Sequence, residues 1–62
     1  MKNEKEILKQ LMASISDMKE DAIAQAMEAI EEANEAGEDF QRGRFMALAE
    51  IEAYLKAIGA SN

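Results

Sequence analysis

The sequence predicts a small all-α protein organised round an antiparallel helical hairpin. The chain contains no proline and only three glycines, and most of the residue types that dominate it are good helix formers. Its apolar residues recur at spacings of three and four, which places them on one face of an α-helix. Gly37 separates two such amphipathic stretches, so the second can fold back on the first.

The length and composition predict a single domain, residues 1–62, with a marginal core. A chain this short buries only roughly 60% of its unfolded surface, and small domains compensate with disulfides, a structural metal or self-association. Cysteine and histidine are both absent, which removes disulfides, the commonest soft-metal ligand and the usual general base. We therefore expect a homodimer or a higher oligomer.

The first predicted helix spans about residues 4–14, with Asn3 as its N-cap. Ser14, Ser16 and Asp17 favour N-caps over helix interiors, and Asp17 with Glu20 matches an aspartate version of the capping box. These residues favour a break, so that a separate N-terminal helix packs across the hairpin. The alternative is one continuous helix through this segment, which would give a two-helix protein.

The two arms of the hairpin are predicted at about residues 18–36 and 40–58. Gly37 just past the first arm is typical of a left-handed C-cap, and Asp39 is a suitable N-cap for the second arm. Gly59 is the expected C-cap of the last helix. Gly43 costs roughly 1 kcal/mol relative to alanine inside a helix, which suggests a close helix approach at that position.

The larger apolar side chains are too numerous for one thin helix–helix contact. Some of them must face outward unless the N-terminal helix or another molecule covers them, and an exposed apolar patch of that kind marks an interaction site. We expect the following residues to form an oligomer or partner interface: Leu8, Leu11, Ile15, Ile23, Met27, Ile30, Leu48, Ile51, Leu55 and Ile58.

A second candidate surface is acidic. It comprises Glu28, Glu31, Glu32, Glu35, Glu38 and Asp39. A bundle-type metal site would need inward Glu-x-x-His pairs, and the run does not match a calcium-binding loop, so we expect no metal. A row of carboxylates could instead imitate nucleic acid and occupy a basic groove. A solvated helix face that keeps the protein soluble is the commoner role of such a row.

Several function classes are disfavoured by composition. No serine has a histidine or a suitably spaced lysine to activate it, so we expect no enzyme and no cofactor. The formal net charge of −6 disfavours direct binding to nucleic acid or to an anionic membrane, and no apolar run approaches the roughly 20 residues of a membrane span. We therefore expect a cytoplasmic protein. Its size and acidity are typical of accessory proteins of phages and mobile elements.

The run from Ala33 to Phe40, followed by Ala47 and Ala49, resembles a tetratricopeptide helix pair. The resemblance covers one hairpin only, and the chain holds no second copy of the repeat, whereas solenoid repeats need several copies. We attribute it to the shared physics of helical hairpins and assign no family.

These observations predict a non-catalytic protein-interaction module. It would associate with itself and with another protein, as a small regulator or inhibitor of a larger one. An acidic nucleic-acid mimic that blocks a DNA- or RNA-binding protein is the alternative, and a structural assembly subunit is the second alternative.

Overall fold

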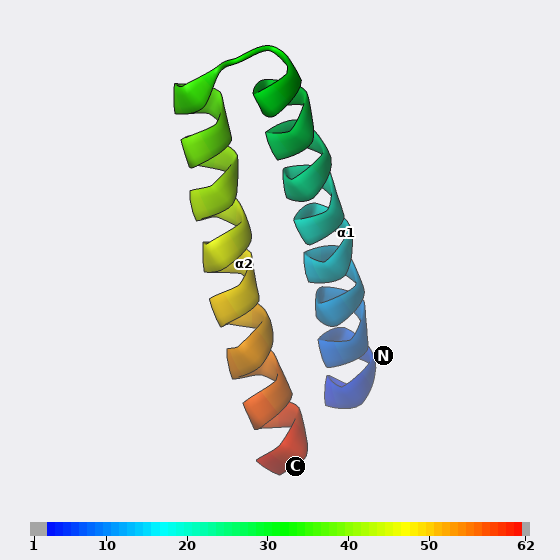
Figure 1. Cartoon of the computed structure of the whole chain (residues 1–62). Coiled ribbons are helices and arrows are strands. Elements are labelled where there is room, and N and C mark those ends of the chain that lie inside the picture. The colour runs from blue at the N-terminus through cyan, green and yellow to red at the C-terminus, as the bar shows by residue number, and fades with distance from the viewer. Residues whose placement is uncertain (1–2, 62) are drawn as a thin grey trace.

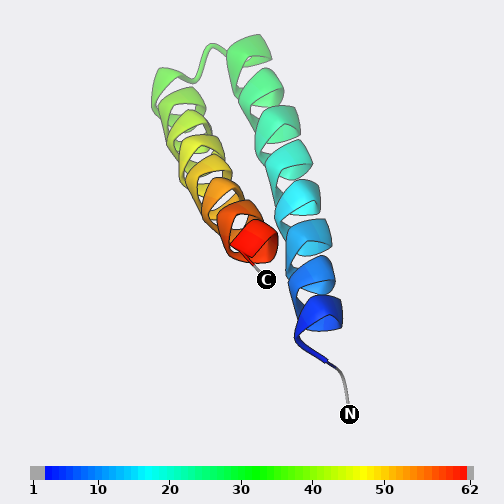
Figure 2. The ribbon, with the colours of Figure 1, turned by 90° about the horizontal axis from the view of Figure 1, so that it is seen from below.

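The computed structural model describes residues 3–61 and contains two antiparallel α-helices (Figure 1). Helix α1 spans Glu4–Glu31 and helix α2 spans Glu35–Ser61. They lie side by side in one layer in both views, and the described ends of the chain lie at the same end of the hairpin (Figures 1 and 2). The molecule measures 46 × 20 × 12 Å. The all-α class and the helical hairpin are confirmed, in the two-helix form.

The favoured break at residues 14–17 is wrong, because α1 runs through them without interruption. Met12, Ile15 and Lys19 are half-buried on the side of α1 that faces α2. Most helical stability in proteins comes from packing of one face, and here that packing outweighs the capping preference of the two serines. No separate N-terminal helix crosses the hairpin among the described residues. Asn3 caps α1 as predicted, since its Oδ1 accepts a hydrogen bond from the Glu6 N–H at 2.9 Å.

The turn lies earlier than predicted, at residues 32–34. The Ala33 N–H donates to the Ile30 carbonyl at 3.1 Å, and the Asn34 N–H donates to the Ala29 carbonyl at 2.8 Å. This pair of bonds is a Schellman motif, in which the residue after the C-cap adopts a left-handed conformation. Ala33 occupies that position with φ 56°. The expected C-cap at Gly37 is therefore wrong.

Asn34, rather than Asp39, caps the second helix. Its Oδ1 accepts from the Gly37 N–H at 3.0 Å, which satisfies one of the free donors of the first turn. A Cβ at position 37 would collide with the Asn34 carboxamide, so a larger residue there would force the capping side chain to shift. Asp39 lies inside α2.

The other two glycines also depart from their predicted roles. Helix α2 continues through Gly59 to Ser61, so Gly59 is not a C-cap. A Cβ at Gly59 would lie 2.9 Å from Leu8 Cδ2, so Gly59 leaves room for the end of the Leu8 side chain. The close approach of the helices that was expected at Gly43 is wrong. At Gly43 itself, a Cβ would meet nothing within 4 Å.

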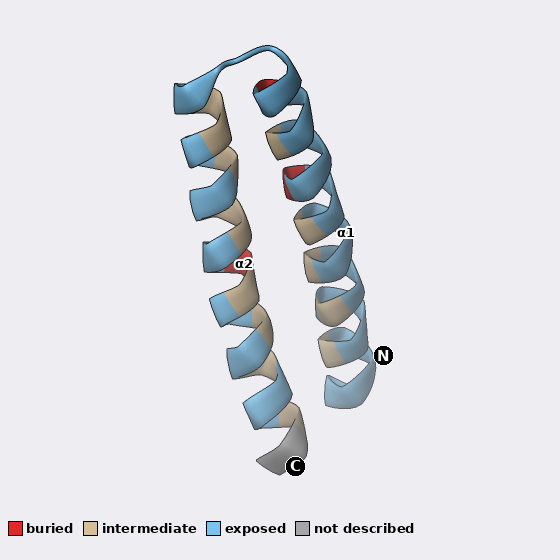
Figure 3. Ribbon diagram, viewed as in Figure 1, coloured by how far each residue is buried: buried red, intermediate tan, exposed pale blue. Residues whose placement is uncertain are grey.

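The contact between the helices is a narrow seam (Figure 3). Its positions alternate at spacings of three and four, the pattern of two helices that pack knobs into holes. Only Ala22, Ala29 and Leu48 are buried among the described residues. The seam consists of Leu8, Met12, Ile15, Lys19, Ala22, Ala26 and Ala29 on α1, and of Glu38, Gln41, Phe45, Leu48, Glu52, Leu55 and Gly59 on α2.

Candidate interaction surfaces

Large apolar side chains lie outside the seam along both helices. The buried positions hold two alanines and one leucine, so the hairpin covers little apolar area of its own. The exposed large hydrophobic residues among those described are Ile7, Leu11, Met18, Ile23, Met27, Ile30, Phe40, Met46, Ile51, Tyr54 and Ile58. The solvent-accessible surface is 4920 Å², whereas a compact monomer of this mass exposes about 4,000 Å².

One group of these side chains forms a surface near the chain ends, which we call the terminal apolar face. Ile7, Leu11 and Ile58 surround a shallow hollow of about 270 Å³ together with Leu55 of the seam. Helical spacings of three and four extend this surface along both helices. The terminal apolar face consists of Ile7, Leu11, Ser14 and Met18 on α1, and of Ala47, Ile51, Tyr54 and Ile58 on α2, all exposed.

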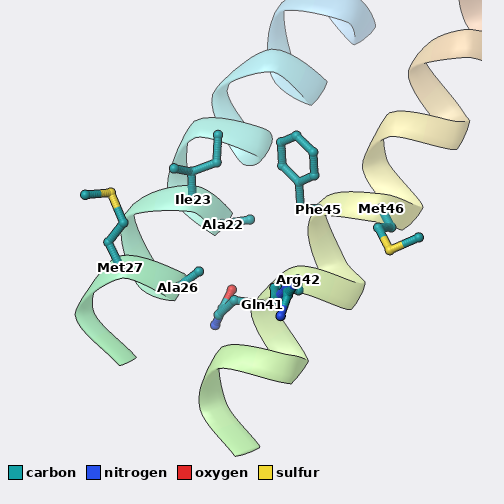
Figure 4. A pocket seen from close by; sticks show the side chains of 8 residues that line it. All are labelled: Ala22, Ile23, Ala26, Met27, Gln41, Arg42, Phe45 and Met46. Atoms are coloured by element: carbon teal, nitrogen blue, oxygen red, sulfur yellow. The ribbon is translucent and has the colours of Figure 1, made fainter. Parts of the chain in front are cut away.

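A second surface lies closer to the turn, and we call it the loop-side groove. It is a hollow of about 350 Å³ between the helices, into which the Phe45 ring projects between the two ribbons (Figure 4). Methionine adapts to irregular and varied partners, and Met27 and Met46 stand on either side of the groove (Figure 4). The groove is lined by Ala22, Ile23, Ala26, Met27, Gln41, Arg42, Phe45 and Met46.

The two surfaces lie on opposite faces of the hairpin. Leu11 and Ile23 are twelve residues apart, which at 3.6 residues per turn is a rotation of about 120° beyond three full turns. The seam lies between these two directions, because Ile15 and Ala22 face α2. Each surface is therefore accessible independently of the other.

Ion pairs connect the two helices next to these surfaces. Arg44 Nη1 donates to Asp21 Oδ2 at 2.7 Å. This pair lies at the end of the terminal apolar face that is nearest the turn. Lys19 Nζ donates to Glu52 Oε1 at 2.9 Å inside the seam, and Lys56 Nζ lies 3.7 Å from the same oxygen. The hydrogen bond from Lys19, followed by the charges of both lysines, lowers the pKa of Glu52 below its ordinary value.

The acidic residues gather round the turn instead of forming a row along one helix. Glu28 and Glu31 belong to the end of α1, Glu32 is its C-cap, and the remaining three belong to the start of α2. Arg42 Nη1 lies 3.4 Å from Glu38 Oε2, four residues away on the same helix. Among the described residues, no group of three or more acidic, histidine or cysteine side chains could hold a metal ion.

The structure divides the predicted interface residues into two sets. Leu8, Ile15, Leu48 and Leu55 face the other helix, whereas the other six are exposed. The exposed six separate further, since Leu11, Ile51 and Ile58 lie on the terminal apolar face and Ile23, Met27 and Ile30 lie on the opposite side of α1.

Sequence reasoning missed four of the exposed large hydrophobic residues on the two surfaces. Ile7, Met18 and Tyr54 belong to the terminal apolar face, and Met46 lines the loop-side groove. A signal was present for Ile7 and Met18, which lie four and seven residues from Leu11 and therefore share its face. For Met46 the spacing alone gave no indication.

Comparisons with models of protein families, with curated proteins and with solved structures give no match for this chain. Within residues 3–61, neither helix is long and apolar enough to cross a membrane. The function of the protein is therefore inferred from the geometry of its own surfaces.

Proposed function

We propose that this chain is a non-catalytic protein-interaction module that associates with itself through an apolar helix face and regulates or inhibits a larger protein. The observation that carries the proposal is the placement of the large apolar side chains. The seam takes up only some of them, beside small residues and a charged pair, while eleven large hydrophobic residues of the described chain stay exposed. Exposed apolar surface on this scale is typical of protein–protein interfaces.

The two-sided arrangement supports the regulatory part of the proposal. One face can be used for self-association while the other contacts a different protein. The loop-side groove, with Phe45 at its floor and Met27 and Met46 beside it, suits an apolar helix laid along a groove, a common mode of peptide recognition.

The acidic mimic receives less support than the interaction module. A mimic of the phosphate backbone needs its charges in an extended row, and the six carboxylates gather round a turn. An electrostatic contact would also weaken steeply with salt, whereas an apolar contact would not. Charge reversal at Glu28, Glu31, Glu32 and Glu35 would abolish the binding of a mimic and leave an apolar contact in place.

The deciding experiment is the mass of the protein in solution, measured by light scattering after size exclusion over a hundredfold range of concentration. The proposal predicts a stable small multiple of 6.9 kDa. A monomer throughout would contradict the self-association. A mass that grows without limit as the concentration rises would instead support a structural assembly subunit.

A further inference from the structure

We propose that the occupant of the terminal apolar face is a second copy of this chain, packed so that the two turns point in opposite directions and the four helices form a bundle. This inference rests on the proposed self-association and specifies its face and its direction. Helix α1 of one copy then lies along α1 of the other, and α2 along α2.

The charge pattern selects this face. Its eight positions carry no charged residue, although the chain as a whole carries a formal net charge of −6. Glu4 lies in the wall of the hollow near the chain end, and the paired Arg44 and Asp21 lie on the loop side of the face. The loop-side groove likewise has one charged residue, Arg42, in its wall. The eight positions of the terminal apolar face can therefore meet those of a second acidic copy without placing like charges in contact.

The area of this face is sufficient for a dimer. Its six large side chains are each roughly half exposed, and a residue of that size presents about 200 Å² when free. Burial of all six removes about 600 Å² per copy and about 1,200 Å² per dimer, which reaches the lower bound for specific interfaces. The hollow between Ile7, Leu11 and Ile58 provides a recess for a side chain of the second copy.

The acidic residues determine the direction. A two-fold axis along the helices would bring both turns, each with six carboxylates, to the same end of the dimer. A two-fold axis across the helices sends the turns to opposite ends and separates these charges by more than the Debye length of about 8 Å in physiological salt. Electrostatics therefore favours the second arrangement.

This arrangement also fits the shape of the face. When Met18 of one copy fills the hollow beside Leu11 of the other, positions 18 and 11 of the two α1 helices lie opposite each other. The two-fold axis then passes close to Ser14, which lies about midway between Leu11 and Met18 along α1. Methionine is well suited to such a recess because it is flexible and unbranched. The same register places Ile51 and Tyr54 of both copies together along α2.

A matched pair of variants tests the face. Ile51 on the terminal apolar face and Ile23 in the loop-side groove are 46% and 47% exposed, so Ile51→Glu and Ile23→Glu make the same change at equal exposure. We expect Ile51→Glu to raise the dimer dissociation constant about a hundredfold or more, because each dimer loses two buried isoleucines. Ile23→Glu should stay within about threefold of the wild type. Circular dichroism checks that both remain helical.

A second matched pair tests the direction. The chain has no cysteine, so Ser14→Cys and Ser16→Cys each introduce a single thiol at an exposed position of α1. Under mild oxidation, Ser14→Cys should form a disulfide-linked dimer at least about tenfold faster than Ser16→Cys, because only position 14 lies beside the proposed two-fold axis and within disulfide reach.

The outcomes separate this inference from the proposed function. A wild-type dimer that is weakened by Ile23→Glu, or that cross-links faster through Ser16→Cys, would overturn the proposed face and keep the self-association. A dimer that is weakened by Ile51→Glu but not cross-linked through Ser14→Cys would overturn the proposed direction. A wild-type protein that is monomeric at every concentration would overturn both.

Discussion

Lys19 and Glu52 form an ion pair inside the seam, with 2.9 Å between Nζ and Oε1. Both side chains are less than a quarter exposed, and the Lys19 ammonium also lies 5.3 Å from the centre of the Phe45 ring. A shift of α2 by one heptad would leave two unpaired charges in the seam, which is costly. The pair is therefore expected to favour this register over a shifted one, as single polar layers do in coiled coils.

This ion pair predicts a loss of stability in acid. The pKa of Glu52 is lower in the folded chain, so its contribution is fully present above the unfolded-state pKa of about 4.3. That contribution is lost as the pH falls below the unfolded-state pKa and through the lower pKa of the folded state. Thermal unfolding between pH 7 and pH 3 should show that Glu52→Gln flattens this decline. Glu20→Gln is the control, because Glu20 is an exposed carboxylate of α1 outside the seam; an equal effect there would contradict the assignment.

Replacement of the whole pair should have a different effect from loss of one member. Lys19→Met alone removes the main hydrogen bond of Glu52 and should lower the midpoint of thermal unfolding. The double variant Lys19→Met with Glu52→Leu should be at least as stable as the wild type, because apolar residues often replace a buried ion pair without loss. Urea unfolding of the four-member cycle checks this. A double variant less stable than the wild type would mean that the pair itself stabilises the hairpin.

The helical hairpin could be predicted from the sequence because helix propensity, spacing and the lack of proline all agree. The exact turn could not. Gly37 is the usual sign of a helix end, whereas the structure uses Ala33 at the left-handed position and Asn34 as the cap. An alanine carries no such signal, and the role of Gly37 depends on packing against a side chain.

The composition of the seam could be predicted only in part. Sequence reasoning selected large apolar residues such as Leu11 for the interface on the first helix. The structure instead buries the neighbouring Met12 and Lys19, because Lys19 has Glu52 opposite it. That partner is 33 residues away, and its position depends on the register of the whole hairpin. The division of the exposed residues into two opposite faces follows from the same register.

The left-handed conformation of Ala33 predicts a stabilising substitution. Its φ of 56° costs a residue with a Cβ about 1–2 kcal/mol, and glycine adopts it without that cost. Glycine loses more conformational entropy on folding than alanine does, and this offsets part of the gain. Ala33→Gly should therefore raise the free energy of unfolding by about 0.5–1 kcal/mol. Chemical denaturation at one fixed protein concentration measures it. Ala36→Gly, within α2, is the control and should destabilise. A loss of stability in Ala33→Gly would contradict the Schellman turn.

Gly43 predicts a second stabilising substitution, and Gly59 is the matched comparison. Gly43 is an exposed interior position of α2 where a Cβ would meet nothing, so Gly43→Ala should raise the free energy of unfolding by about 1 kcal/mol and the melting temperature by about 4–8 °C. Gly59→Ala should gain less, because its Cβ would lie 2.9 Å from Leu8 Cδ2 and the leucine would have to move. Both should be melted at the same protein concentration, since self-association makes the melting temperature depend on it. An equal gain in the two variants would show that Leu8 moves aside without cost. No gain in Gly43→Ala would show that position 43 makes a contact absent from the single hairpin.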